Sequence, residues 1–186
     1  MPDAAPGSDE ALVASSLRGD DSAFAQIVAR HKSRIFAMAA RYARGAHELD
    51  DIAQEVFLRA HRHLHKFRAE APFAHWLARV ATSTCLDFLR RERRQRDSIP
   101  LDSLQNEPRD DGPARVTEAA LARETLLHAM RQLPPKEQLV ITLCELEERS
   151  IREVASLTGW SEANVKVRAF RARQNLKKIL QLTDEH

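Results

Sequence analysis

Apolar residues recur every three or four positions along most of this chain, which is the spacing of one face of an α-helix. One such stripe lies near the C-terminus and is made by Val165, Ala169, Ala172, Leu176 and Ile179. Glycine and proline stand mainly between the stripes and break the chain into segments. The pattern therefore predicts an all-α protein.

The first half of the chain carries four predicted helices, at 9–17, 21–44, 50–67 and 73–96. Asp20, Asp21 and Ser22 are N-cap candidates for the second helix, and Gly45 is its expected end. In the third helix the inward residues are Ile52, Val56 and Leu64. The buried stripe expected for the fourth consists of Phe73, Trp76, Leu77, Val80, Ala81, Thr84, Cys85 and Phe88.

The composition changes after residue 96, where prolines, Gly112 and several acids replace the apolar period. Such a segment is typical of a flexible linker. The sequence thus predicts two small helical domains, 1–96 and 117–186, joined by the linker 97–116. The residues before Ser8 are expected to form a frayed tail.

The second domain is predicted to hold four helices, the last two forming a helix-turn-helix. Ser150 and Glu153 have the spacing of a capping box, and Gly159 can take the left-handed conformation that ends a helix. Ser161 can then cap a second helix that runs to Leu180. Off the buried stripe of that helix lie the cations Lys166, Arg168, Arg171, Arg173, Lys177 and Lys178.

A helix-turn-helix with a basic second helix is typical of binding in a DNA major groove. The alternative is a helical hairpin whose basic face is merely solvated. Ala155, Gly159 and Val165 favour the DNA-binding motif, because a plain amphipathic hairpin does not need small residues at these offsets.

The formal net charge is only +2, so the chain is not a general polycation. Its basicity is local, at 90–96 and 166–178, as a nucleic-acid footprint requires. One or two cations would satisfy the C-terminal dipole of the fourth helix. The five arginines at 90–96 therefore indicate phosphate contacts.

The third helix has a second face, made by Asp51, Gln54, Glu55 and Leu58. An acidic and amide-bearing face beside an apolar residue is either a solvated surface or a docking site for a basic partner. The residue pattern alone favours the solvated surface.

The other candidate sites, at histidines and cysteines, have weaker support in the sequence. His61 and His65 are spaced to share a helix face, with His63 pointing elsewhere, but no further metal ligand is apparent. Cys85 and Cys144 stand singly in apolar patterns and are expected to be buried hydrophobes rather than redox sensors.

We find no catalytic motif, secretory signal or membrane span in the sequence. The sequence therefore predicts a cytoplasmic protein that is not an enzyme and that has no metal, cofactor or small-molecule substrate.

Three strings, DDIAQEVFLRAHRHLHKF, FAHWLARVATSTCLDFLRRERR and QLPPKEQLVITLCELEERSIREVASLTGWSEANVKVRAFRARQNLKKIL, resemble segments of an alternative sigma factor. The resemblance is to the extracytoplasmic-function class (group IV) of the sigma-seventy family, over 11–96 and 117–180. It implies a transcription initiation factor that binds core RNA polymerase and promoter DNA. The rival interpretations are a helix-turn-helix regulator that never joins polymerase and a protein-binding adaptor.

The resemblance assigns Asp51, Gln54, Glu55 and Leu58 to the clamp helices of the polymerase beta-prime subunit, which reverses the preference for a solvated surface. It places a pocket for a flipped promoter base at 68–73. Ser83 and His61 depart from the Asn and the aromatic residue that are common there. The minus-ten contacts that it implies are Arg68, Phe73, Trp76, Ser83, Asp87, Arg90, Arg91, Arg93 and Arg94.

In the second domain the resemblance implies recognition of the minus-thirty-five element. The string Ala-Asn-Val-Lys-Val-Arg at 163–168 replaces the frequent Gly-Thr-Val-Lys-Ser-Arg. The expected contacts are Ser161, Glu162, Asn164, Lys166, Val167, Arg168, Arg171 and Arg173. An anti-sigma factor that covers both domains is the further partner that the resemblance implies.

Because Asn164 and Val167 differ from the residues common in the family, we expect an unusual promoter preference. Asn164→Thr should shift that preference toward the commoner one. The measurement is promoter selection by the variant and the unchanged protein from the same set of promoters. An identical selection would contradict the assignment of Asn164 to base recognition.

Overall fold

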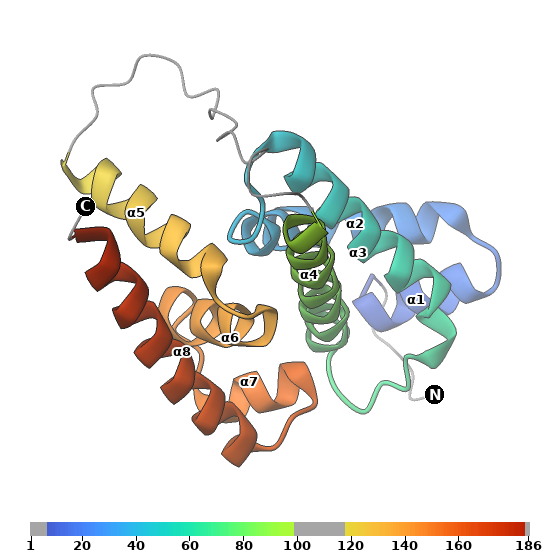
Figure 1. Cartoon of the computed structure of the whole chain (residues 1–186). Coiled ribbons are helices and arrows are strands. Elements are labelled where there is room, and N and C mark those ends of the chain that lie inside the picture. Colours follow the sequence, from blue (N-terminus) through green and yellow to red (C-terminus); the bar gives the residue numbers. More distant parts are fainter. Residues whose placement is uncertain (1–6, 99–117, 185–186) are drawn as a thin grey trace. The chain divides into compact units, whose positions relative to one another are not determined.

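The computed structural model describes residues 7–98 and 118–184 (Figure 1). Every regular element among these residues is helical, which confirms the all-α prediction. Backbone contacts divide the chain into two units, Met1–Cys85 and Leu86–His186, with the division inside one long helix. Each unit is described by itself.

The first unit holds α1 (Asp9–Leu17), α2 (Asp21–Ala39), α3 (Ala46–Arg62), a 3-10 turn (Leu64–Lys66) and the start of α4 (Phe73–Ser98). The Ser8 hydroxyl caps α1 by accepting the Ala11 N–H. The Asp20 carboxylate caps α2 by accepting the N–H groups of Ser22 and Ala23. A further hydrogen bond, from the Ser22 hydroxyl, lowers the pKa of the Asp20 carboxyl.

Two predicted helix boundaries were wrong. Helix α2 ends at Ala39 rather than near Gly45, because the chain turns there to bury Tyr42, whose N–H donates to the Ala39 carbonyl over 2.9 Å. Helix α3 already begins at Ala46. In its first turn the Glu48 carboxylate accepts hydrogen bonds from the backbone N–H of Arg44 (2.7 Å) and from the Arg44 guanidinium.

The other end of α3 was also predicted wrongly, since the helix stops at Arg62 and not at Phe67. A tighter turn follows, in which the Lys66 N–H donates to the His63 carbonyl over 2.8 Å. This turn places both Leu64 and Phe67 in the core.

A large cluster of buried residues in the first unit receives side chains from each of the helices α1 to α4. Helix α2 contributes one residue per turn, including Ala23, Ile27 and Ile35. Ile52 and Val56 of α3 are buried as predicted. On α4 most of the expected stripe is buried, but Trp76 and Val80 are only partly so.

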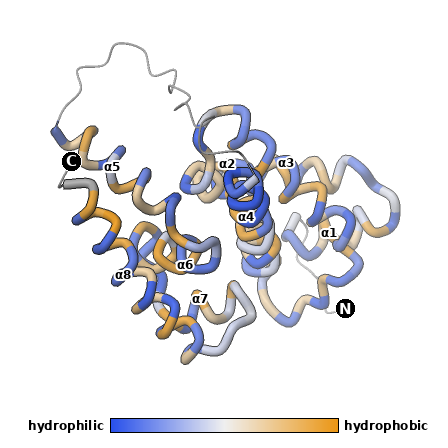
Figure 2. The backbone as a smooth tube through the Cα atoms, in the orientation of Figure 1, coloured by the Kyte–Doolittle hydropathy of each residue, from blue (hydrophilic) through white to orange (hydrophobic). Residues whose placement is uncertain are grey.

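The second unit consists of the end of α4 together with α5 (Glu118–Gln132), α6 (Pro135–Ile141), α7 (Ile151–Thr158) and α8 (Glu162–Asp184). A π-helical turn, Thr142–Leu146, follows α6. Helix α8 packs against α5, α6 and α7. Figure 2 shows the resulting alternation of apolar and polar residues along these helices.

The predicted helix-turn-helix is present in α7 and α8. The Ser150 hydroxyl accepts the Glu153 N–H (3.2 Å) while the Glu153 carboxylate accepts the Ser150 N–H (2.9 Å). Gly159 has φ +73°, the left-handed conformation expected of it. The Ser161 hydroxyl then accepts the Asn164 N–H. Val165, Ala169 and Ala172 are buried as predicted.

Helix α4 runs through Asp97 and Ser98, two residues into the predicted linker. The rest of that linker and most of the predicted N-terminal tail lie outside the described residues. The domain boundaries at 96 and 117 remain predictions.

Ser150→Ala should destabilise the second unit by about 1 kcal/mol at neutral pH, the usual cost of losing an N-cap. The Ser150 hydrogen bonds lower the pKa of the Glu153 carboxyl below its ordinary 4.5. Their contribution is therefore present above that pH and lost as the pH falls through the lowered pKa. The measurement is urea unfolding followed by circular dichroism.

The control is Ser33→Ala, which removes an exposed serine from the middle of α2. Equal urea midpoints for the two variants at neutral pH would contradict the capping box as a source of stability. The difference in urea midpoint between the two variants should become smaller as the pH falls through the lowered pKa of Glu153. A difference that stays the same in acid would contradict the role of the Glu153 charge.

Candidate nucleic-acid interface

The first candidate surface is one side of α3. Asp51, Gln54, Glu55 and Leu58 are spaced three, four and seven residues along that helix and so share a face. Asp51 and Gln54 are exposed, Glu55 is half-buried, and Leu58 keeps 49% of its surface exposed. An exposed leucine between polar neighbours is typical of a docking surface when an apolar patch continues beside it.

The acids of this face already have partners within α3. The Glu55 carboxylate accepts Arg59 Nε over 2.6 Å and also lies 3.4 Å from an Arg62 nitrogen. Asp51 lies 3.6 Å from His47 Nε2. The Asp51–His47 pair is exposed and contributes little to stability, so a basic partner can replace it at small cost.

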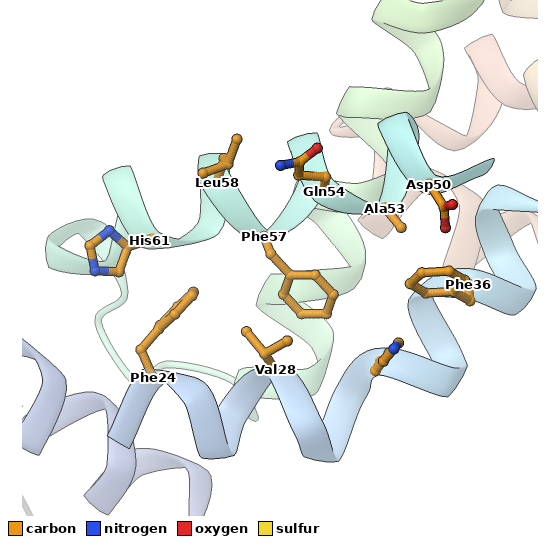
Figure 3. A pocket seen from close by; sticks show the side chains of 10 residues that line it. Phe24, Val28, Phe36, Asp50, Ala53, Gln54, Phe57, Leu58 and His61 are labelled. Atoms are coloured by element: carbon orange, nitrogen blue, oxygen red, sulfur yellow. The ribbon is translucent and has the colours of Figure 1, made fainter. Parts of the chain in front are cut away.

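An apolar groove of about 600 Å³ lies between α2 and α3, beside this face (Figure 3). Phe24, Val28 and Phe36 rise into it from α2, and Ala53 and Phe57 point toward it from α3. Gln54 and Leu58 also belong to its lining. The α2 residues of this groove are not among the site residues predicted from the sequence. The sequence does hold a sign of the groove, because the apolar residues of α2 cover a wider stripe of the helix than the single row that is buried.

The loop before α4 is flanked in sequence by residues of an aromatic cluster. Arg68 is exposed, and Ala69 has φ +55°, which is unusual for a residue with a side chain. Phe73 packs on Phe67 and Trp76, with ring centroids 5.4 and 5.5 Å apart.

Phe73 has 0% of its surface exposed, which corrects its predicted contact with the minus-ten element. Its ring belongs to the core of the first unit. Trp76 is half-buried, so part of its surface is exposed.

The predicted contacts farther along α4 are exposed or partly exposed, and some of them already have partners. Ser83, Arg91 and Arg94 are exposed. Arg90 donates to Asp87 over 3.2 Å, and Arg93 donates to Asp97 over 3.1 Å. The end of α4 thus has arginines at every turn, two of them held by acids of the same helix.

The outer face of α8 carries Lys166 and Arg171, both exposed; their phosphate contacts remain predictions. Ser161 and Glu162 are exposed at its start. Val167 is 49% exposed and Phe170 61% exposed, three residues apart on one face. Phe170 is not among the contacts predicted from the sequence. Its position off the buried stripe was the signal that an aromatic ring here faces outward.

Two predicted contacts on α8 are held by other side chains. The Arg168 guanidinium stacks 4.9 Å above the centre of the Trp160 ring and donates from Nε to Asn164 Oδ1 over 2.6 Å. Arg173 donates twice to Oε1 of Glu145, over 3.0 and 2.6 Å. Arg173 therefore ties α8 to the π-helical turn.

The histidine geometry expected from sequence was wrong. Because α3 ends at Arg62, His61 and His65 do not share a helix face. His61 packs its ring edge on Phe24 (4.6 Å), while His63 and His65 have ring centroids 6.4 Å apart. Within the described residues no three His, Cys, Asp or Glu side chains form a group that could hold a metal ion.

The two cysteines differ in burial. Cys85 is buried as expected, whereas Cys144 is only partly buried, which corrects that part of the prediction. Burial, together with the neighbouring Glu145, raises the pKa of the Cys144 thiol. A raised pKa keeps the thiol protonated and therefore unreactive at neutral pH.

Comparison with known proteins explains why one chain carries both the face of α3 and the basic residues of α4 and α8. Residues 27–95 match the Sigma-70 region 2 family and residues 123–176 match the Sigma-70, region 4 family. The chain belongs to the sigma-70 family. It is 33% identical over 173 residues to the ECF RNA polymerase sigma factor SigM of Mycobacterium tuberculosis, covering 93% of this chain and 85% of that protein. It is 28% identical to the ECF RNA polymerase sigma-E factor of Escherichia coli, over 93% and 94% of the two chains.

Solved sigma-factor structures resemble this fold. The structure of CnrH in complex with the cytosolic domain of CnrY matches with a TM-score of 0.59 and 26% identity, over 94% of this chain and 97% of that one. The sigma factor RpoE in complex with the anti-sigma factor NepR, from Bartonella quintana, matches with a TM-score of 0.55 and 19% identity, over 85% and 96%. The second likeness shows the fold alone.

This ECF sigma factor is an initiation factor that acts with RNA polymerase, and neither matched family is a family of enzymes. In the part of the chain that the structure describes, none of the helices has the length and apolar character needed to cross a bilayer.

Phe73→Ala should destabilise the first unit by about 3–5 kcal/mol, because it empties a fully buried aromatic site. The matched control is Phe170→Ala, which removes an exposed ring and should leave stability unchanged. Urea unfolding of both variants is the measurement. A loss below about 1 kcal/mol for Phe73→Ala would contradict its place in the core.

Proposed function

We propose that this sigma factor divides promoter recognition between its two matched regions. The face of α3 binds the clamp helices of core polymerase, the loop at 68–73 and α4 open the minus-ten element, and α8 reads the minus-thirty-five element. The observation that carries the proposal is that both sigma regions occur on one chain and each leaves a polar or basic face exposed.

The α3 face suits a helical partner with basic and apolar residues. Asp51 and Glu55 supply negative charge, while Leu58 and the groove beside it supply apolar surface. Gln54 lies between the two and can donate and accept hydrogen bonds. The arrangement supports helix-in-groove docking, in which apolar anchors enter the groove and the rim charges steer the encounter.

The loop at 68–73 and α4 suit single-stranded DNA. Arg68 is exposed in the loop, and Trp76 in the first turn of α4 keeps part of its surface exposed. A flipped base loses its stacking energy of a few kcal/mol, which an aromatic platform can partly restore. Farther along α4, Arg90, Arg91 and Arg94 are exposed and can hold the phosphates of the displaced strand.

Helix α8 suits duplex DNA. Lys166 and Arg171 would fix its position through phosphates, and Asn164 and Val167 near its start would face base edges. Phe170 adds an apolar contact that fits the C5-methyl group of thymine.

An anti-sigma factor would control this activity. Both structures compared above are of complexes, one of CnrH with CnrY and one of RpoE with the anti-sigma factor NepR. The α2–α3 groove is apolar and open, so a protein that covers it would also mask the polymerase-binding face. Because core polymerase works on the chromosome, the protein would act in the cytoplasm.

Gln54→Ala should weaken binding to core polymerase about tenfold, the effect of losing roughly 1.4 kcal/mol at a central contact. Promoter-dependent transcription at limiting protein should fall with it. The measurements are binding of the full-length chain to core polymerase and in vitro transcription.

Gln26→Ala is the matched control, because Gln26 is an exposed glutamine on α2 that does not line the groove. Equal core binding by the two variants would contradict the α3 face as the docking site. No promoter-dependent transcript from any genomic upstream fragment would contradict the function as a whole.

A further inference from the structure

Three side chains around the start of α8 form a connected group. Trp160 precedes the helix, and its ring carries the stacked guanidinium of Arg168 at 4.9 Å. Arg168 Nε donates to Asn164 Oδ1 over 2.6 Å, one helical turn back. The Ser161 hydroxyl accepts the Asn164 backbone N–H, so the residue that carries this amide is itself held by the N-cap.

This contact orients the Asn164 amide. The Nε–H of arginine can only donate, so the atom that faces it must be the amide oxygen. The oxygen and nitrogen occupy opposite arms of a planar carboxamide, so the NH₂ group is turned away from Arg168. Asn164 is exposed, which leaves that NH₂ group accessible to a partner.

The pair also has a definite polarity. The guanidinium carries further N–H donors and a full positive charge beside the amide oxygen. The oxygen keeps a second lone pair, but a donor that approaches it meets the positive charge of Arg168. Toward a DNA groove, therefore, Asn164 and Arg168 together present donors.

We propose that Asn164 and Arg168 act as one donor pair that selects keto bases in the minus-thirty-five element. Guanine offers two major-groove acceptors, N7 and O6, and thymine offers O4. Adenine and cytosine each present an amino group that would oppose these donors. The inference rests on the proposed function, and it differs from the usual bidentate reading of adenine by asparagine.

The role of Trp160 is to hold the pair. A guanidinium held over an aromatic ring loses fewer conformations when it binds than an unsupported one, which helps to keep Nε–H directed at Asn164. Trp160 is half-buried in the turn between α7 and α8, so its ring is a fixed platform. It is a positioning residue for the contact and need not touch DNA.

The test is a promoter library randomised across the minus-thirty-five element and transcribed by core polymerase with the full-length protein. At the position that Asn164 contacts, guanine and thymine should exceed adenine and cytosine by about tenfold, within the range of one good base contact. Asn164→Asp, which replaces the donor by acceptors, should reverse the preference at that same position.

Arg168→Lys is the second variant, because it keeps the charge but loses the Nε contact and the stack. It should flatten the preference at that position and raise the share of adenine. The matched control is Arg123→Lys at an exposed position on α5, which should leave the preference unchanged. Circular dichroism and core binding report whether each variant is folded.

Two results would overturn the inference while leaving the proposed function intact. One is normal promoter-dependent transcription in which Asn164→Asp and Arg168→Lys change the base preference at no position. The other is a preference of the unchanged protein for adenine or cytosine at the position that these variants affect. If no promoter-dependent transcript is made, the proposed function fails and the inference fails with it.

Discussion

Each helix in units this small can bury only one side, and this constraint decides where the functional residues lie. In α8 the buried side is Val165, Ala169 and Ala172, whose small size lets the helix pack against its neighbours. Burying that stripe turns Val167 and Phe170 outward together with the basic residues. The same rule in α3 buries Ile52 and Val56 and exposes the acidic face. A surface for partners is therefore a direct result of forming the core.

Features fixed by local hydrogen bonds could be predicted from the sequence. The capping box of Ser150 and Glu153 and the left-handed Gly159 depend on residues within one turn, and all were confirmed. The end of α2 was missed because it depends on burial of Tyr42, a tertiary effect that breaks a helix whose local pattern continues. The expected pairing of His61 with His65 failed for the related reason that the chain tightens after Arg62 to bury Leu64 and Phe67.

The candidate site was predictable in its residue types but not in its pairings. The sequence could place arginines on α4 and α8, yet not show that Arg93 is held by Asp97 or Arg173 by Glu145. It also could not show the α2–α3 groove, because whether an apolar residue is buried or lines a groove depends on its neighbours across helices. Phe73 illustrates the opposite error, since a position matched to a DNA contact proved to be core.

The most direct test of the whole account is a footprint of one promoter with the protein alone, with core polymerase alone and with both. The account predicts protection of the minus-thirty-five element and permanganate-reactive thymines at the minus-ten element only when both are present, because the two regions act on DNA through the polymerase. Full protection by the protein alone, unchanged by core polymerase, would contradict it and identify a regulator that does not join polymerase.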